Sequence, residues 1–138
     1  MALFEFPVRV YWEDTDAGGI VYHANYLKFF ERARTEWLRA LGINQNALRE
    51  QTGGVFVASD LSIEYLRPAR LDDELLVTAA ARSTGQASLV IAQQALRKMR
   101  DPSPPELLCE ASVRIGWVNA ATLKPTRLPS HVLEKFRP

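Results

Sequence analysis

The sequence predicts an α+β protein in which about five antiparallel strands surround one long helix. Apolar residues first recur with the period of a helix, between residues 24 and 41. Four later segments alternate apolar and polar residues in the manner of strands. No stretch of helical length separates these segments, and parallel strands need crossovers of about a dozen residues, so the strands are expected to pair antiparallel. A chain of 138 residues argues for one domain with one core, over residues 1–138.

The first strand and the helix are expected in the first third of the chain. Val8, Val10 and Trp12 alternate with polar neighbours and predict a strand over residues 4–12. The helix is expected over residues 24–41, with Asn25 as its N-cap and Gly42 as its stop. One helical stripe, which we interpret as core rather than a cofactor site, contains Tyr26, Phe29, Phe30, Ala33, Trp37 and Leu41.

The second half of the chain is expected to contain the remaining strands. Cys109 falls on the apolar side of the last strand and is interpreted as an inert core residue. The proline-rich stretch 101–105 is expected at a hairpin tip, and His131 on the surface of a short terminal helix. The expected strands span residues 57–65, 75–81, 87–96 and 107–118, and the terminal helix spans residues 130–136.

Composition excludes several classes of function. Seventeen Lys and Arg against 16 Asp and Glu leave a net charge of +1, too balanced for a non-specific nucleic-acid binder. Cys109 is the only cysteine, which excludes an internal disulfide and a cysteine-cluster metal site. The two histidines, His23 and His131, argue against a multi-histidine metal site. The sequence has no cationic leader and no apolar run of about 18 residues, so we expect a cytoplasmic protein without integral membrane association.

The segment that carries chemistry runs from Arg9 to Tyr26. It places Asp16 in a loop with paired glycines, a few residues before the helix begins. The first N–H groups of a helix have no partner within the helix and lie at the positive end of its dipole. An acyl oxygen bound there would be stabilised as it gains negative charge, while the carboxylate attacks or activates water. These are the parts that acyl-transfer hydrolysis needs.

The same pattern has other interpretations. A polar stretch between a strand and a helix is most often a loop in which Asp supplies turn hydrogen bonds. An aspartyl phosphotransferase would carry Thr or Val where Gly18 stands. A calcium loop starting at Asp14 would carry Glu where Asn25 stands.

The segment resembles the active-site signature of the 4-hydroxybenzoyl-CoA thioesterase branch of the hotdog thioesterases. It is most similar to the short acyl-CoA thioesterases encoded with the Tol-Pal envelope machinery. Further similarity lies in residues 30–36, 64–73 and 88–90 and in the closing Leu128-Pro129. The resemblance implies a hotdog fold, in which the sheet wraps around the helix. The matching positions are Arg9, Val10, Thr15, Asp16, Gly19, Ile20, Val21, His23 and Tyr26.

The resemblance implies roles for particular residues. Asp16 would be the catalytic nucleophile or general base, and His23 would contribute its backbone N–H as oxyanion donor and its ring to orient the thioester or water. It implies no metal and no cofactor. The residues expected to bind substrate are Tyr22, Asn25, Tyr26 and Ser88.

The expected substrate is a short-chain or aromatic acyl-CoA. Some relatives carry a basic cluster just before the position of Ser88, where this chain has Thr84-Gly-Gln-Ala with Arg82 as the nearest cation. Arg67 and Arg70 are interpreted as surface charges rather than a CoA phosphate site. An acyl carrier protein is therefore a second possible carrier of the acyl group.

The fold resemblance implies a homodimer or a homotetramer with sites at the interface. Two alternatives to the hydrolase stay open. One is a non-catalytic acyl-thioester-binding or scaffold protein of envelope or lipid metabolism. The other is a hotdog enoyl-thioester hydratase, whose Asp and His lie closer in sequence than Asp16 and His23 do.

Overall fold

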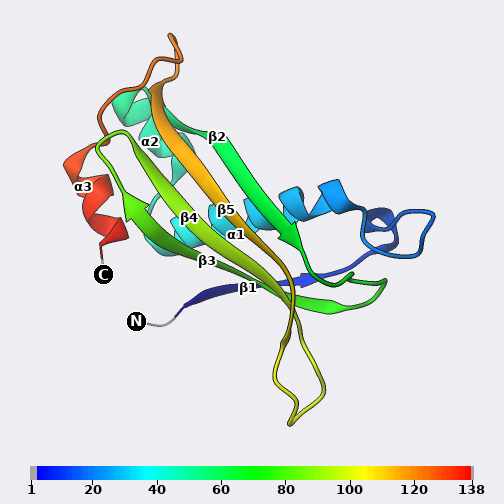
Figure 1. Ribbon diagram of the computed structural model, residues 1–138. Helices are drawn as coiled ribbons and strands as arrows, with labels where there is room; N and C mark the ends of the chain where they lie inside the picture. The colour runs from blue at the N-terminus through cyan, green and yellow to red at the C-terminus, as the bar shows by residue number, and fades with distance from the viewer. Residues whose placement is uncertain (1–2, 138) are drawn as a thin grey trace.

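The computed structural model describes residues 3–137 and contains a five-stranded antiparallel sheet in the order β1-β3-β4-β5-β2 (Figure 1). Each neighbouring pair of strands runs antiparallel, as the short connections predict. The strands are β1 (Phe4–Arg9), β2 (Gly54–Tyr65), β3 (Glu74–Thr84), β4 (Ser88–Arg97) and β5 (Glu106–Asn119). The predicted α+β class is confirmed, with β1 and β2 as the two edges of the sheet.

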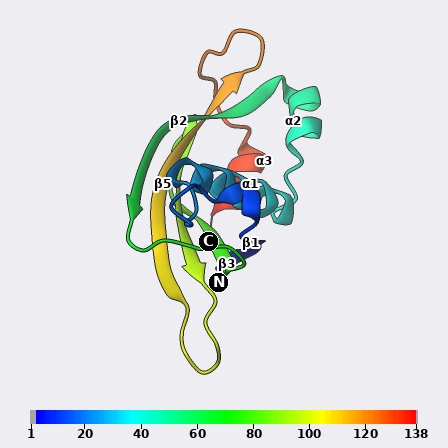
Figure 2. The same ribbon diagram turned by 90° about the vertical axis from the view of Figure 1, so that its right-hand side faces the viewer.

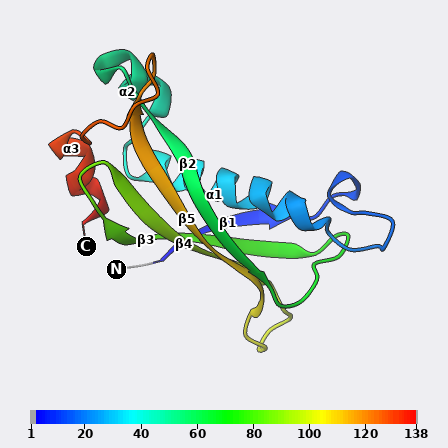
Figure 3. The same ribbon diagram turned by 45° about the horizontal axis from the view of Figure 1, so that its top comes forward.

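One long helix lies across the sheet, and the sheet curves around it (Figure 2). Two short helices lie at one end of the sheet, and the loop that precedes the long helix projects beyond the opposite end (Figure 3). The helices are α1 (Tyr26–Ala40), α2 (Gln45–Thr52) and α3 (Ser130–Leu133). None of the helices in the described part of the chain has the length and apolar character that a bilayer crossing requires.

The apolar stripe of α1 supplies the core, as its periodicity predicts. Phe29 and Phe30 are completely buried, and Trp37 contacts the C-terminal Phe136 at a ring-centroid distance of 5.4 Å. Cys109 is fully buried in the β5 wall opposite α1, which confirms its assignment to the core. Burial of such aromatic side chains contributes about 1.5 to 3 kcal/mol each. The core therefore fixes α1, and with it the loop that enters the helix.

The expected end of the first strand was wrong. β1 ends at Arg9 rather than residue 12, and Trp12 is 80% exposed at the start of a 3-10 turn. The Asp14 carboxylate accepts the Tyr11 N–H at 2.8 Å, which turns the chain away from the sheet. Asn25 occupies the N-cap position of α1, as expected, but it has helical backbone angles and its side chain caps no backbone N–H. The stop at Gly42 is confirmed by a φ of +82° there.

The helix α2 was not expected from the sequence. Its N-cap is Asn44, whose side chain accepts the Ala47 N–H at 3.0 Å, and Gly53 ends it with a φ of +75°. Leu48 is the only buried residue of α2, so the sequence of this helix has no apolar stripe that would predict it. The short terminal helix was predicted correctly, as α3 followed by a 3-10 turn, and His131 is exposed as expected.

Candidate active site

Asp16 lies on a tight turn outside the sheet. The Gly19 N–H donates to the Asp16 carbonyl at 3.0 Å, and the Asp16 N–H donates to the Ile20 carbonyl at 2.9 Å. Gly19 has a φ of +76°, a region that residues with a Cβ rarely enter. A Cβ on Gly18 would come within 3.1 Å of the Asp16 Oδ1, which accepts the Gly18 N–H at 2.8 Å. The paired glycines therefore hold an exposed carboxylate with one oxygen bonded to the backbone.

A second carboxylate, Asp14, anchors this loop from inside. It is 7% exposed, and its two oxygens accept from the Tyr11 N–H at 2.8 Å and the Asn25 side-chain amide at 2.9 Å. Its carbonyl also accepts the Tyr22 N–H at 3.0 Å. Asp14 and Asn25 therefore tie the end of the first strand to the entrance of α1.

His23 begins a 3-10 turn (His23–Asn25) that leads directly into α1. Within residues 3–137 the His23 N–H donates no backbone hydrogen bond, as expected for the start of a helical segment. The His23 carbonyl accepts the Tyr65 hydroxyl at 2.7 Å. The His23 ring is exposed, with the Tyr22 ring at 4.7 Å and the Tyr65 ring at 6.3 Å between centroids.

A cavity of about 290 Å³ opens beside this turn. Tyr26 forms part of its floor, and the Tyr26 hydroxyl accepts the Ala69 N–H at 3.1 Å. Burial raises the pKa of Tyr26 above its ordinary value, and burial also raises the pKa of Tyr65. Both hydroxyls therefore stay protonated at neutral pH. The cavity is lined by Ile20, Val21, His23, Tyr26, Tyr65, Leu66, Arg67 and Pro68.

The candidate residues differ in where they lie. His23 and Tyr26 line the cavity, and Asp16 lies on the adjoining turn through its bond to Ile20. Tyr22 is exposed beside the His23 ring, and Asn25 is buried against Asp14 rather than lining the cavity.

Ser88 lies far from this group within one chain. It begins β4 at the end of the sheet near α2 and α3, whereas the loop before α1 lies at the opposite end (Figure 1). The Ser88 hydroxyl accepts from Arg114 at 3.4 Å. Its expected role in substrate binding stays a prediction that needs a second chain.

Two residues that sequence reasoning did not single out support the site. Asp14 was not chosen, because the nearby Asp16 matches the family signature and nothing in the sequence distinguishes a buried aspartate from an exposed one here. Tyr65 ends the predicted strand 57–65, and no local pattern shows that its hydroxyl reaches His23, 42 positions away. Among the described residues no group of three His, Cys, Asp or Glu side chains is placed to hold a metal ion.

Comparison with known proteins assigns the chain to a family. The model of the thioesterase-like superfamily matches residues 10–136. The chain belongs to this superfamily. The chain is 43% identical over 133 residues to the acyl-CoA thioesterase YbgC of Haemophilus influenzae, and the aligned region covers 96% of this chain and 93% of that protein. It is also 43% identical over 135 residues to the acyl-CoA thioester hydrolase YbgC of Escherichia coli O6:H1, covering 98% and 96%.

A solved structure has the same fold as this chain. A mutant of 4-hydroxybenzoyl-CoA thioesterase in complex with 4-hydroxybenzoyl-CoA has a TM-score of 0.91 at 16% identity, covering 99% of this chain and 100% of that one. The likeness confirms the predicted hotdog fold. The expected family is confirmed as well.

Proposed function

We propose that this chain hydrolyses acyl-CoA thioesters to a free acid and a free thiol. The observation that carries the proposal is the exposed Asp16 carboxylate on its glycine turn. This turn is bonded to Ile20, and Ile20 lines the same cavity as His23, whose N–H donates no backbone hydrogen bond among residues 3–137. The names of the two YbgC relatives support the same activity. Hydrolysis of this kind needs a carboxylate and an oxyanion donor, and the segment 16–23 offers both.

The proposed chemistry has two possible first steps. Asp16 attacks the thioester carbonyl, the C–S bond breaks to release the thiolate, and water then hydrolyses the mixed anhydride. Alternatively, Asp16 takes a proton from water, the resulting hydroxide attacks the carbonyl carbon, and the C–S bond breaks to release the free acid and the thiolate, which takes up the proton. In both routes negative charge develops on the carbonyl oxygen, and the His23 N–H is the proposed donor to it. Such a donor lowers the activation barrier by about 3 to 4 kcal/mol.

The proposed substrate carries a short-chain or aromatic acyl group. Three aromatic side chains, His23, Tyr26 and Tyr65, surround a cavity of about 290 Å³, near the lower limit for small-molecule pockets. CoA is the proposed carrier, and acyl carrier protein is the second one to test. The proposed location is the cytoplasm, and the whole chain is proposed to form one domain. A link to the Tol-Pal machinery stays a prediction.

We propose that the active unit is a homodimer, or a tetramer built from two dimers. β2 is an edge strand with a row of free backbone groups, and it exposes Val57 and Leu61, at 37% and 41%. The Arg34 guanidinium lines a cavity of about 320 Å³ between α1 and β2. Burial lowers the pKa of Arg34, and it forms no ion pair among residues 3–137. The Arg34 guanidinium donates to the Gln93 Oε1 at 3.0 Å, and a second copy along β2 would have to bring a further acceptor to it, since covering a charge without a partner costs free energy.

Such pairing would also explain the position of Ser88. A two-fold axis at the β2 edge reverses the direction of the partner sheet. The partner's Ser88 end would then point toward the Asp16 end of the first chain. Mixed dimers of Asp16→Asn and Ser88→Ala chains should recover activity, because one of their two sites would contain neither change. Light scattering that shows a monomer, or mixing without recovery, would contradict this arrangement.

Steady-state hydrolysis of a panel of acyl-CoA thioesters tests the function. Asp16→Asn should lower kcat by about 10² to 10⁴-fold, while Asp101→Asn in the exposed β4–β5 loop should keep the wild-type rate. Equal rates for wild type and Asp16→Asn would refute the role of Asp16. Tight thioester binding without turnover would favour the binding protein, and hydration of crotonyl-CoA would favour the hydratase.

Oxygen-18 separates the two proposed routes. In a single turnover in labelled water, anhydride breakdown can leave label on the Asp16 carboxylate if Asp16 is the nucleophile. A general base acquires no label. Label in the peptide that contains Asp16, read by mass spectrometry, identifies Asp16 as the nucleophile.

A further inference from the structure

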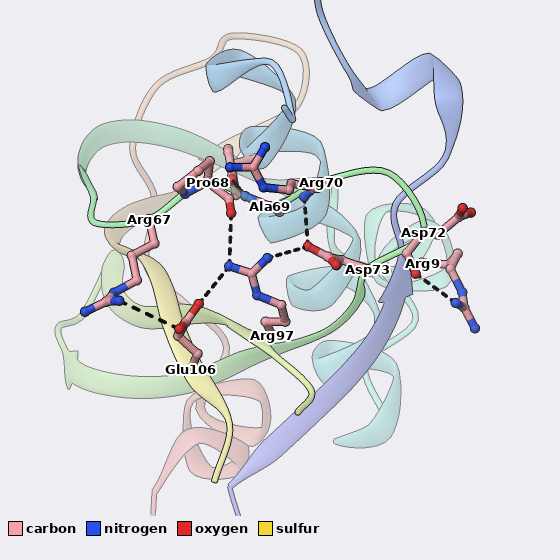
Figure 4. Close-up of polar contacts among 10 residues, drawn as sticks. Arg9, Arg67, Pro68, Ala69, Arg70, Asp72, Asp73, Arg97 and Glu106 are labelled. Atoms are coloured by element: carbon pink, nitrogen blue, oxygen red, sulfur yellow. Dashed lines mark hydrogen bonds and ion pairs between the residues drawn. The ribbon is translucent and has the colours of Figure 1, made fainter. Parts of the chain in front are cut away.

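Arg97, the last residue of β4, binds three partners through one guanidinium group (Figure 4). Its Nη1 lies 2.8 Å from the Asp73 Oδ2, and its Nη2 lies 2.7 Å from the Glu106 Oε1. Nη2 also donates to the Pro68 carbonyl at 3.2 Å. The Arg97 side chain is only 20% exposed. It therefore joins β4 and β5 to the segment between β2 and β3.

The Asp73 carboxylate links Arg97 to the backbone of the β2–β3 connection. Its Oδ2 accepts both the Arg97 guanidinium and the Arg70 N–H, each at 2.8 Å. Burial by itself lowers the pKa of Arg97, but the hydrogen bonds and charges of Glu106 and Asp73 outweigh it and raise the pKa overall. The cation is thus permanent, and it holds the two ends of the connection, at Pro68 and Asp73.

The segment 68–70 in turn supports the loop that carries Asp16. The Val21 N–H donates to the Ala69 carbonyl at 2.9 Å, and Ile20 and Arg70 form an antiparallel bridge. The Ile20 carbonyl accepts the Asp16 N–H at 2.9 Å. A short series of contacts therefore leads from the Arg97 guanidinium to the backbone of Asp16. Pro68 of this segment and the preceding Arg67 form part of the cavity wall.

Other cations nearby are placed differently. Arg67 is 64% exposed and lies 3.7 Å from the Glu106 Oε2, a loose contact at the surface. Arg9 donates to the Asp72 carbonyl at 2.9 Å but is half exposed and does not touch Pro68 or Asp73. Only a planar fork with several donors satisfies two carboxylates and a carbonyl at once, and a lysine ammonium lacks that geometry.

We propose that Arg97 is a positioning residue that fixes the Asp16 turn and the cavity wall for thioester hydrolysis. The proposal rests on the proposed function. Arg97 does not touch Asp16 and does not itself line the cavity, so it acts through its contact with Pro68 and through residues 69–73 and 20–21. A displacement of about 1 Å at a reacting group can cost about 10²-fold in rate, so a loosened support should affect turnover more than folding.

The kinetic test compares Arg97→Met and Arg97→Lys with Arg39→Met, an exposed arginine on α1 that pairs with Glu36. Arg97→Met should lower kcat at least about tenfold per folded molecule, with a smaller change in KM. Arg97→Lys should recover part of the loss, since it keeps the charge but not the fork. Arg39→Met should match wild type. If Arg97→Met lowers only the Tm and leaves kcat unchanged, Arg97 is merely structural and the proposal is overturned. Glu106→Gln, a milder change that keeps the Asp73 and Pro68 contacts, replaces Arg97→Met if that variant does not fold. A smaller fall in kcat is then expected, and an unchanged kcat would overturn the proposal.

Hydrogen exchange gives a readout that does not depend on activity. In Arg97→Met the amides of residues 16–21 should exchange faster, while those of α2, at the far end of the sheet, should not change. If wild type hydrolyses no thioester, the proposed function fails, and faster exchange at residues 16–21 would still support the mechanical link. Unchanged exchange there overturns the link whether or not the protein is a thioesterase.

Discussion

Asp14→Ala should destabilise the fold by about 2 to 4 kcal/mol, although Asp14 is not the proposed reacting carboxylate. The change removes both acceptors, at 2.8 Å from the Tyr11 N–H and 2.9 Å from the Asn25 amide. An orphaned buried donor costs about 1 to 3 kcal/mol. Most of this cost comes from the Asn25 amide, because it is buried. The Tyr11 N–H lies nearer to solvent and can form a hydrogen bond to water instead.

A double-mutant cycle measures the pair directly. Urea unfolding of wild type, Asp14→Ala, Asn25→Ala and the double variant should give a coupling free energy of about 1.5 to 3 kcal/mol, typical of a hydrogen bond to a charged group. Asp16→Ala is the matched control, because within residues 3–137 its exposed carboxylate accepts only the Gly18 N–H. It should change the free energy of unfolding by less than about 1 kcal/mol.

Two results would refute this reasoning. A cost below about 0.5 kcal/mol for Asp14→Ala is the range of ordinary surface substitutions, and it would mean that the buried contacts contribute nothing. Single effects that simply add in the double variant would mean that Asp14 and Asn25 do not stabilise each other. In either case the loop before α1 would be held by other contacts.

Three further changes test the fold. Gly54→Ala places a Cβ within 2.2 Å of the Trp117 ring, so we expect a loss of about 1 to 3 kcal/mol and altered tryptophan fluorescence, and an unchanged urea midpoint would contradict the packing. Tyr26→Phe leaves the Ala69 N–H without its acceptor and should cost about 1 to 2 kcal/mol by urea unfolding, and an unaffected midpoint would refute the bond. Burial raises the pKa of Cys109 to about 12. Between the unfolded thiol's ordinary value and pH 12 only the unfolded chain loses the proton, so stability should fall by about 1.4 kcal/mol per pH unit. Cys109→Ala should lack this part of the alkaline loss, and identical pH profiles for the two proteins would contradict it.

The fold could be predicted because its signals are local. The stripe on α1 and the alternation along β5 each lie within one segment, and the short connections leave only antiparallel pairing. α2 was missed because eight residues with one buried side chain carry no periodic pattern. The end of β1 was missed because Asp14 and Asn25, 11 positions apart, set it by a tertiary contact.

The candidate site was predictable only in part. The residues alone indicated a carboxylate before a helix, but a plain loop explained the pattern as well, and the choice of Asp16 came from the resemblance. The supports of the site come from distant parts of the chain: Ala69 meets Val21, and Tyr65 meets His23. Contacts between residues more than 40 positions apart leave no trace in a local pattern.

The two carboxylates of the loop show why sequence pattern and function separate here. Asp14 and Asp16 are chemically the same and two positions apart, but the 3-10 turn Trp12–Asp14 directs the first inward and leaves the second in solvent. The inward carboxylate accepts two hydrogen bonds that hold the entrance of α1, while Asp16 keeps one oxygen without a hydrogen bond among the described residues. A carboxylate that attacks or takes a proton needs such a free oxygen, and a carboxylate that anchors a loop needs none. Removal of Asp14 should therefore appear first in stability, and removal of Asp16 first in turnover.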